Sequence, residues 1–324
     1  VHSLPSTDVE HANDPLWTAI CAEVRDVINE EPMLEDFLTA TILDQTSLES
    51  ALSAHLGNQI DCATVPARVL CNVISEAFAT RNDIRQAMRD DLQAVVERDS
   101  ACEALHLPLL YFKGFQALQL HRVANWLWNQ NRQSLALLMQ SRASMKFSVD
   151  IHPAAKFGHG IMLDHATGLV VGETAVVGNQ VSILQSVTLG GTGKEHGDRH
   201  PKIRDGVLIS AGAKILGNIT VGEGAKVGAG SVVLRDVPAH QQAAKALIDA
   251  VKGLLSDEYI ELGYKADSAA VDLLRHKFKS NNTAPEFKLN ERSFLHQIAQ
   301  DGFYGLWSDL GAFRNIRTPF TDLC

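Results

Sequence analysis

Histidine and aspartate are concentrated in two short segments near the middle of the chain. Asp150 lies in the first segment, residues 149–155, and Asp164 and His165 lie in the second, residues 163–168. A histidine near its unperturbed pKa of about 6.5 accepts a proton at neutral pH, and a carboxylate on its other ring nitrogen fixes the tautomer and stabilises the imidazolium. Asp150 and His165 are therefore a candidate dyad for activating a hydroxyl group. A purely structural pair is the plainer alternative.

A charged, glycine-containing segment follows at residues 193–202, which read GKEHGDRHPK. Ordered loops on rigid scaffolds often carry function, whereas a tolerated surface insertion is the alternative. A phosphate-binding P-loop is excluded here, because residues 190–194, GGTGK, lack its glycine spacing and the hydroxyl residue after the lysine.

These polar residues lie within a six-residue repeat that runs from Ile151 to Pro238. Each unit opens with an aliphatic or aromatic residue, and a generally small or β-branched residue follows four positions later. A period of six with recurrent glycine predicts a parallel β-solenoid in which three units make one triangular coil. The opening residues of the thirteen units are Ile151, Phe157, Leu163, Val171, Val177, Ile183, Leu189, Ile203, Ile209, Ile215, Val221, Val227 and Val233.

The repeat is interrupted where the polar residues lie. Two extra residues follow His165, and eight extra residues separate Leu189 from Ile203. The second interruption must leave the solenoid as a loop. The candidate base and the charged loop are therefore both expected at irregular turns of an otherwise regular scaffold.

Helical periodicity dominates the residues before the repeat. Asp14 is expected to cap a first helix that begins at Pro15, and the polar stretch 99–108 is expected to be a turn. We predict an α + β protein: an α-helical N-terminal domain over 1–145, a left-handed parallel β-helix over 146–240, and a helical extension of unknown role over 241–324. Helices of that extension are expected to cap the open edge of the solenoid. Further helices are expected from residue 32 and over 34–43, 47–56, 66–78, 84–98 and, as one long helix, 112–140.

Composition excludes several classes of protein. A net charge of -9 over 324 residues argues against nucleic-acid binding, which needs clustered Lys and Arg. No apolar run is long enough to span a membrane, and five cysteines without CxxC spacing indicate free thiols. Residues 1–5 show no targeting pattern. We expect a cytoplasmic protein, or an organellar one if a targeting peptide has been removed.

The stretch from about Ala94 to His240 closely resembles serine O-acetyltransferases, hexapeptide-repeat enzymes that begin cysteine synthesis. The matching segments are residues 108–115, 149–155, 160–168, 182–194 and 198–203. The resemblance implies that His165 is the general base and Asp150 its partner. It also places Asp99, Asp164, Arg199 and His200 around the amino acid. The chemistry agrees, because the serine ammonium calls for carboxylates and the serine carboxylate for a bidentate guanidinium.

The resemblance further implies acetyl-CoA as co-substrate and no metal. Small residues on the solenoid would line the pantetheine arm, and two lysines would meet the phosphates. It also implies L-serine as substrate, L-cysteine as feedback inhibitor, and a homotrimer or a dimer of trimers with active sites between subunits. The candidate coenzyme residues are Gly191, Ala211 and Ala229 for the pantetheine arm and Lys214 and Lys226 for the phosphates.

The chain departs from the family after Pro238. Helical sequence follows His240, and the last residue is Cys324, whereas many family members end in an isoleucine that inserts into O-acetylserine sulfhydrylase. Cysteine buries less apolar surface than isoleucine, and the lost burial costs about 1 to 2 kcal/mol of binding free energy. We therefore expect no tight cysteine synthase complex.

Three other functions remain open on the sequence. A zinc hydro-lyase would use His165, His196 and His200 as metal ligands. A non-catalytic scaffold would need none of the polar residues. A related acetyltransferase would act on a sugar or on homoserine, although sugar enzymes generally lack the helical N-terminal region.

Overall fold

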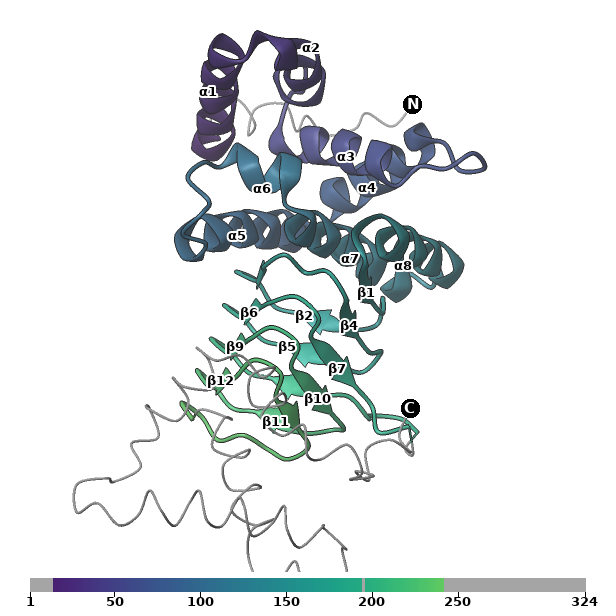
Figure 1. Cartoon of the computed structure of the whole chain (residues 1–324). Coiled ribbons are helices and arrows are strands. Elements are labelled where there is room, and N and C mark those ends of the chain that lie inside the picture. The colour runs from purple at the N-terminus through teal and green to yellow at the C-terminus, as the bar shows by residue number, and fades with distance from the viewer. Residues whose placement is uncertain (1–13, 194–195, 242–324) are drawn as a thin grey trace, which may run out of the picture. The chain divides into compact units, whose positions relative to one another are not determined.

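The computed structural model describes residues 14–193 and 196–241 (Figure 1). In this part of the chain, helices occupy the N-terminal half and short strands follow. None of the described helices is long and apolar enough to cross a membrane. The helices are α1 (Pro15–Glu30), α2 (Glu35–Leu38), α3 (Leu48–Gln59), α4 (Ala67–Thr80), α5 (Asn82–Arg98), α6 (His106–Tyr111), α7 (Lys113–Asn129) and α8 (Gln133–Phe147), with a 3-10 turn at Pro32–Leu34 and a π-helical turn at Thr39–Leu43.

The start of the first helix is confirmed, but one long helix is not. Asp14 accepts hydrogen bonds from the backbone N–H groups of Leu16 and Trp17, and Pro15 is the first helical residue. The single helix expected over 112–140 is wrong, because α7 ends at Asn129 and α8 begins at Gln133. Between them Asn131 has a φ of 59°, a left-handed conformation that asparagine tolerates and that reverses the chain.

The repeat folds into three parallel sheets. The described strands are β1 (Val149–Ile151), β2 (Lys156–Phe157), β3 (Met162–Leu163), β4 (Leu169–Val171), β5 (Val176–Val177), β6 (Ser182–Ile183), β7 (Thr188–Gly190), β8 (Lys202–Ile203), β9 (Leu208–Ile209), β10 (Lys214–Leu216), β11 (Thr220–Val221), β12 (Lys226–Val227) and β13 (Val232–Val233). The first sheet has the order β1-β4-β7-β10-β13, the second β11-β8-β5-β2 and the third β12-β9-β6-β3. Each strand contains one of the opening residues, and all but the half-buried Phe157 are buried. The β-helix predicted from the repeat is confirmed.

Three rows of turns connect these sheets, and we name them by the sheets that they join. The 1–2 corner comprises residues 152–155, 172–175, 191–193 with 196–201, and 217–219. The 2–3 corner comprises residues 158–161, 178–181, 204–207 and 222–225. The 3–1 corner comprises residues 164–168, 184–187, 210–213 and 228–231.

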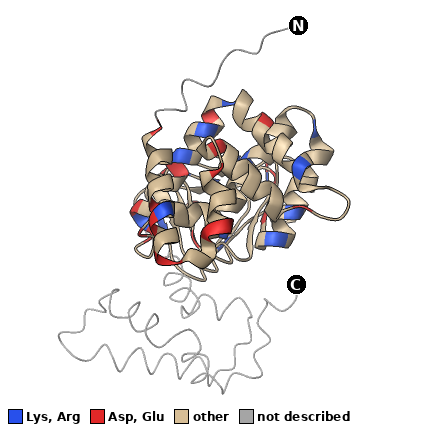
Figure 2. Ribbon diagram, turned by 90° about the horizontal axis from the view of Figure 1, so that it is seen from above, with Lys and Arg blue, Asp and Glu red and all other residues tan. Residues whose placement is uncertain are grey.

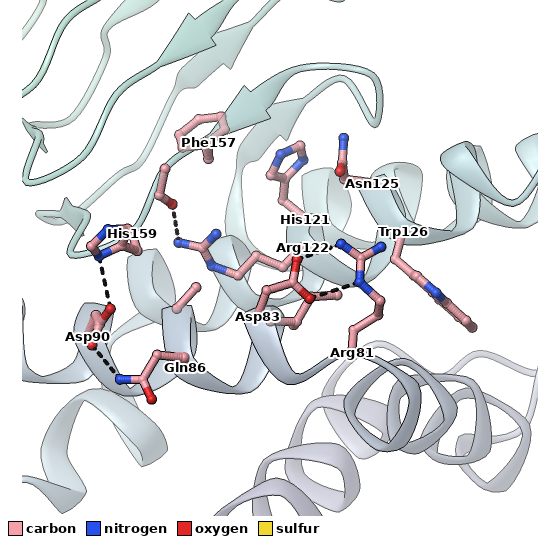
Figure 3. A pocket seen from close by; sticks show the side chains of 13 residues that line it. Arg81, Asp83, Gln86, Asp90, His121, Arg122, Asn125, Trp126, Phe157 and His159 are labelled. Carbon is pink, nitrogen blue, oxygen red and sulfur yellow. Dashed lines mark hydrogen bonds and ion pairs between the residues drawn. The ribbon is translucent and has the colours of Figure 1, made fainter.

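Helices α5 and α7 cover the open end of the first coil. Its backbone has no preceding coil to pair with, so side chains take that role. Asn125 of α7 donates to the carbonyls of Pro153 and Ala155 at 2.8 and 3.1 Å. Arg122 of α7 donates to the Gly158 carbonyl at 2.8 Å (Figure 3).

The described helical and β-helical parts belong to one compact unit and share a continuous apolar core. Acidic and basic residues are interspersed over the helices of this unit (Figure 2). The helices expected after Gln241, their capping role and the sulfhydrylase contact lie outside the described residues. The division at 145 and 240 stays a prediction.

Candidate active site

The 3–1 corner of the first coil is a strained turn. His165 and Ala166 both have left-handed backbone conformations, with φ of 52° and 56°, and Gly168 follows at 76°. Consecutive left-handed residues other than glycine are unfavourable, and such strain is often found at functional sites. The turn buries the Ala166 side chain completely and leaves 75% of the His165 side chain exposed. The two extra residues in the repeat thus present an imidazole to solvent.

The start of α7 supports this turn. A Cβ atom at Gly114 would overlap the carbonyl oxygen of Leu163, so only glycine allows the helix to approach the residue before Asp164. Lys113 donates a hydrogen bond from Nζ to the Thr167 hydroxyl. His165 Nε2 lies 3.7 Å from Asp164 Oδ1, and the Asp164 side chain is about a quarter exposed.

Asp150 lies on β1 and is half-buried, with its carboxylate held by α8. Asp150 Oδ1 accepts a hydrogen bond from Gln140 Nε2 at 2.7 Å. Among the described residues, no hydrogen bond joins Asp150 to His165. The structure therefore gives Asp150 a partner that the sequence did not suggest, and leaves the expected dyad as a proposal.

The 1–2 corner holds the guanidinium group of Arg199. Arg199 donates to Glu173 Oε2 at 2.8 Å and to the Gly197 carbonyl at 3.1 Å. The hydrogen bond from Arg199 lowers the pKa of the Glu173 carboxyl, with a further contribution from its positive charge. Glu173 was missed in the sequence. The repeat could have located Glu173, because residues 172–175 occupy the same corner as the inserted loop in the preceding coil.

His200 is buried in the same corner, and Thr174 orients it. The Thr174 hydroxyl lies 2.8 Å from His200 Nδ1 and accepts from the backbone N–H groups of Arg199 and His200 at 3.0 and 3.1 Å. The Thr174 N–H donates to Nδ1 at 3.2 Å, so the neutral ring carries its proton on Nε2. A Cβ atom at Gly172 would overlap the ring. Burial, then the charge of Arg199, lowers the pKa of His200.

Asp99 directly follows α5 as its C-cap residue and begins the expected turn. Its Oδ1 accepts a hydrogen bond from the Ala101 N–H at 2.9 Å. Below the turn, Val95 and Cys102 pack with Met162 of β3 in a small apolar cluster separate from the main core. Because Met162 lies two residues before Asp164, the turn is placed beside the 3–1 corner.

The expected site residues therefore fall into two groups within one chain. Asp99, Asp164 and His165 lie at or beside the 3–1 corner, whereas Arg199 and His200 lie at the 1–2 corner. Asp150 lies on the first sheet, which separates the two corners.

The candidate coenzyme residues are also distributed over different faces. Ala211 and Ala229 lie at the 3–1 corner on successive coils beyond His165. Gly191 lies at the 1–2 corner, against Arg199. Lys214 on the first sheet donates to the Ser186 carbonyl at 2.6 Å and to the Thr188 hydroxyl at 3.1 Å, and Lys226 is exposed on the third sheet.

The three histidines of the zinc alternative do not lie at one corner, since His165 and His200 are on different edges of the first sheet. In the described part of the chain, no group of three His, Cys, Asp or Glu side chains is arranged to hold a metal ion.

A cavity of about 440 Å³ lies away from all these residues, between α5, α7 and the first 2–3 corner (Figure 3). Its lining includes two ion-paired groups, Asp90 with His159 at 2.9 Å and Arg81 with Asp83 at 2.5 Å. None of the expected site residues lines this cavity.

Comparison with known families identifies two matching models. The model described as serine acetyltransferase, N-terminal, matches residues 16–120, and the bacterial transferase hexapeptide model matches residues 200–235. The serine acetyltransferase of Escherichia coli K12 is 58% identical over 229 residues, which are 71% of this chain and 84% of that protein.

Solved structures agree with these matches. A soybean serine acetyltransferase complexed with serine is 56% identical, with a TM-score of 0.69 over 70% of this chain and 93% of that one. A Brucella abortus serine acetyltransferase in complex with coenzyme A is 52% identical, with a TM-score of 0.69 over 70% and 91%. A serine acetyltransferase complex with cysteine is 55% identical, with a TM-score of 0.69 over 70% and 94%.

Proposed function

The chain belongs to the serine acetyltransferase family, and from that membership we propose that it is an L-serine O-acetyltransferase in which His165 is the general base. The observation that carries the assignment of the base is the strained 3–1 corner, which presents His165 to solvent beside Asp164. A base that must reach a substrate hydroxyl needs this exposure.

The reaction proceeds by direct attack of serine on the thioester. His165 takes the hydroxyl proton as the serine oxygen forms its bond to the acetyl carbonyl carbon. The C–S bond then breaks, and the departing thiolate of coenzyme A receives the proton from the imidazolium. The products are O-acetylserine and coenzyme A, with no covalent intermediate on the protein. Such general-base assistance contributes about 10² to 10⁴ in rate.

Charge complementarity determines how serine is bound. Asp99 and Asp164 receive the ammonium group, while Arg199 and His200 receive the carboxylate. The contact with Glu173 fixes Arg199 in one orientation, and Thr174 leaves the Nε2 proton of His200 as a donor. Asp150 stabilises the imidazolium of His165 when the proton has been taken.

Because the two groups lie on opposite edges of the first sheet, we propose that two copies of the chain complete each site. In a cyclic trimer whose axis faces the first sheet, each 3–1 corner meets the 1–2 corner of the next copy, and the ring closes with equivalent sites. Exposed apolar side chains on this sheet and directly after its last strand support such an interface: Val170 is 42%, Val232 56% and Leu234 59% exposed. Pairing of two trimers through the helices follows from the family resemblance.

Mixing two inactive variants tests the shared site. At a serine concentration near the KM of the unaltered protein, we expect His165→Asn and Arg199→Ala each to have lost most of their activity when assayed alone. After co-refolding or co-expression, some sites combine the intact 3–1 corner of one variant with the intact 1–2 corner of the other, and activity returns. Recovery of activity is the expected result. A mixture that stays as inactive as its components would show that one chain supplies the whole site.

Acetyl-CoA is placed along the 3–1 corner in this proposal. The backbone of Ala211 and Ala229 continues the line of His165 along the coils, so the pantetheine arm would bring the thioester to the base. Lys226 and Lys214 are the proposed phosphate contacts, and Gly191 would face the arm from the neighbouring copy.

L-cysteine has the same ammonium and carboxylate as serine, so we propose that it inhibits by binding in the serine site. Arg199→Ala should then weaken serine and cysteine binding together. Cysteine inhibition that persists while serine binding collapses would require a separate site.

A coupled assay of thiol release tests the acceptor. With acetyl-CoA as donor, L-serine should be acetylated much faster than homoserine or a hydroxyl-bearing sugar. A preference for either of the latter would replace serine as the substrate.

A further inference from the structure

We infer that Arg98 positions Asp99 for amino-acid binding by holding the end of α5 on the second coil. This inference rests on the proposed role of Asp99 in binding the substrate ammonium. Arg98 itself contacts protein groups, and its effect on the substrate is exerted through its neighbour in the chain.

The contacts of Arg98 cross from the helical part to the β-helix. Its guanidinium group donates to Gln180 Oε1 and, at 3.2 Å, to the Ser182 hydroxyl. Ser182 is buried on β6, and Gln180 lies in the 2–3 corner with a left-handed φ of 57°. A Cβ atom at Gly160, one coil below, would overlap the Gln180 amide, so the acceptor is closely packed.

Helix α5 is also attached to the first coil, two turns earlier. Asp91 is fully buried, is paired with Arg122 at 2.7 Å and accepts the Ile161 N–H at 2.9 Å. Asp90 pairs with His159 at 2.9 Å (Figure 3). Residues seven apart lie on the same face of a helix, so Asp91 and Arg98 attach one face of α5 to successive coils.

The end of α5 needs this second attachment for Asp99 to stay in place. The last turn of a helix frays readily, and a carboxylate there faces the negative end of the helix dipole. The apolar cluster of Val95, Cys102 and Met162 supports the turn from below. The contacts of Arg98 fix its position along the axis of the β-helix, which sets the distance from Asp99 to Asp164.

Steady-state kinetics of the full-length protein test the inference. Arg98→Met should raise the KM for serine about tenfold and weaken cysteine inhibition similarly, because small displacements of a binding group are costly. The KM for acetyl-CoA and the thermal midpoint should change little. Gln180→Asn combined with Ser182→Ala removes the same contacts from the other side and should have the same effect. Arg81→Met is the matched control, since Arg81 pairs with Asp83 at the other end of α5.

A double-mutant cycle separates this inference from the proposed function. With Asp99→Asn already present, Arg98→Met should add little to the serine KM. An unchanged KM in both Arg98→Met and the Gln180/Ser182 variant would overturn the inference, as would a full additional effect in the Asp99→Asn background. If Asp99→Asn alone leaves the serine KM unchanged, the proposed binding role of Asp99 fails, and the inference fails with it.

Discussion

His165 lies in a turn that its backbone conformation disfavours, and its side chain contributes little to packing. His165→Asn should therefore preserve the fold, because asparagine tolerates a left-handed φ, while acetyl transfer falls by about 10² to 10⁴. The turnover number at saturating serine and the thermal midpoint are the measurements. His240→Asn is the matched control, since His240 has a φ of 58° in the last described turn. Near-normal turnover of the first variant would contradict the role of His165.

Glu173 controls the orientation of Arg199. Glu173→Gln removes the charge of the partner but keeps its shape, so the guanidinium group should lose its fixed position and the KM for serine should rise about three- to tenfold. The turnover number should change less. Initial rates at varied serine concentrations measure the effect. A lower KM would mean that Glu173 competes with the substrate carboxylate for Arg199.

Buried His121 predicts a pH dependence of stability. Burial, with a smaller contribution from Arg122, lowers its pKa to about 3 from 6.5. As the pH falls below 6.5, His121 is protonated in the unfolded state but stays neutral in the folded state. The free energy of unfolding therefore decreases between pH 6.5 and 3.

Replacing His121 tests this dependence. His121→Phe should flatten the slope between pH 6.5 and 5 by up to about 1.4 kcal/mol per pH unit. The edge contact with Phe157 can be kept by the new ring. Urea unfolding at several pH values measures the slope, and equal slopes in the two proteins would refute the prediction.

The sequence predicted candidate residues better than their partners. His165, Asp164 and Arg199 lie at repeat interruptions, which are visible along the chain. Gln140 contacts Asp150 from helix α8, and Glu173 contacts Arg199 from the preceding coil. The types of Gln140 and Glu173 alone gave no reason to single them out. Residues distant in sequence become partners only after coils are stacked and α8 is docked.

At the scale of elements, α7 takes the place of the coil that would precede β1–β3. Arg122 is central to this contact, because it pairs with Asp91 and also binds the Gly158 carbonyl. Arg122→Met should reduce the free energy of unfolding by about 3 to 5 kcal/mol, since it leaves a buried carboxylate unpaired. Arg81→Met, which breaks an exposed pair, should cost less than about 1 kcal/mol. Chemical denaturation of both variants measures the difference, and equal losses would contradict the capping role.

The strands could be predicted from sequence because their six-residue period is local. Helix boundaries were less secure. The stretch 112–140 has helical composition throughout, and a single left-handed residue, Asn131, divides it. That conformation depends on α8 packing back against α7, a tertiary contact that periodicity does not contain.

At the scale of the whole molecule, the first sheet is the proposed interface between copies. Val232→Glu places a charge on its exposed surface and should shift the protein toward smaller species, with a parallel loss of activity. Sedimentation velocity and the rate of thiol release measure the two effects, and Lys156→Glu, at an exposed position of the second sheet, is the control for added charge. A fully assembled Val232→Glu variant would argue against this interface.

The proposed contacts to the amino acid and to the coenzyme lie at different positions along the axis of the β-helix. The β-helix residues that we propose to contact the amino acid lie between Asp150 and His200, in the coils nearest the helices. The site residues farther along the β-helix contact only the coenzyme in our proposal. Where no residues are inserted, strands one coil apart are related by a shift of eighteen residues, as in the pairings of Val170 with Thr188 and of Lys214 with Val232. Duplication of one such unit in the distal part would add a coil to the region proposed to contact the donor without disturbing recognition of the acceptor. Donor affinity and acceptor choice can thus evolve independently in this architecture.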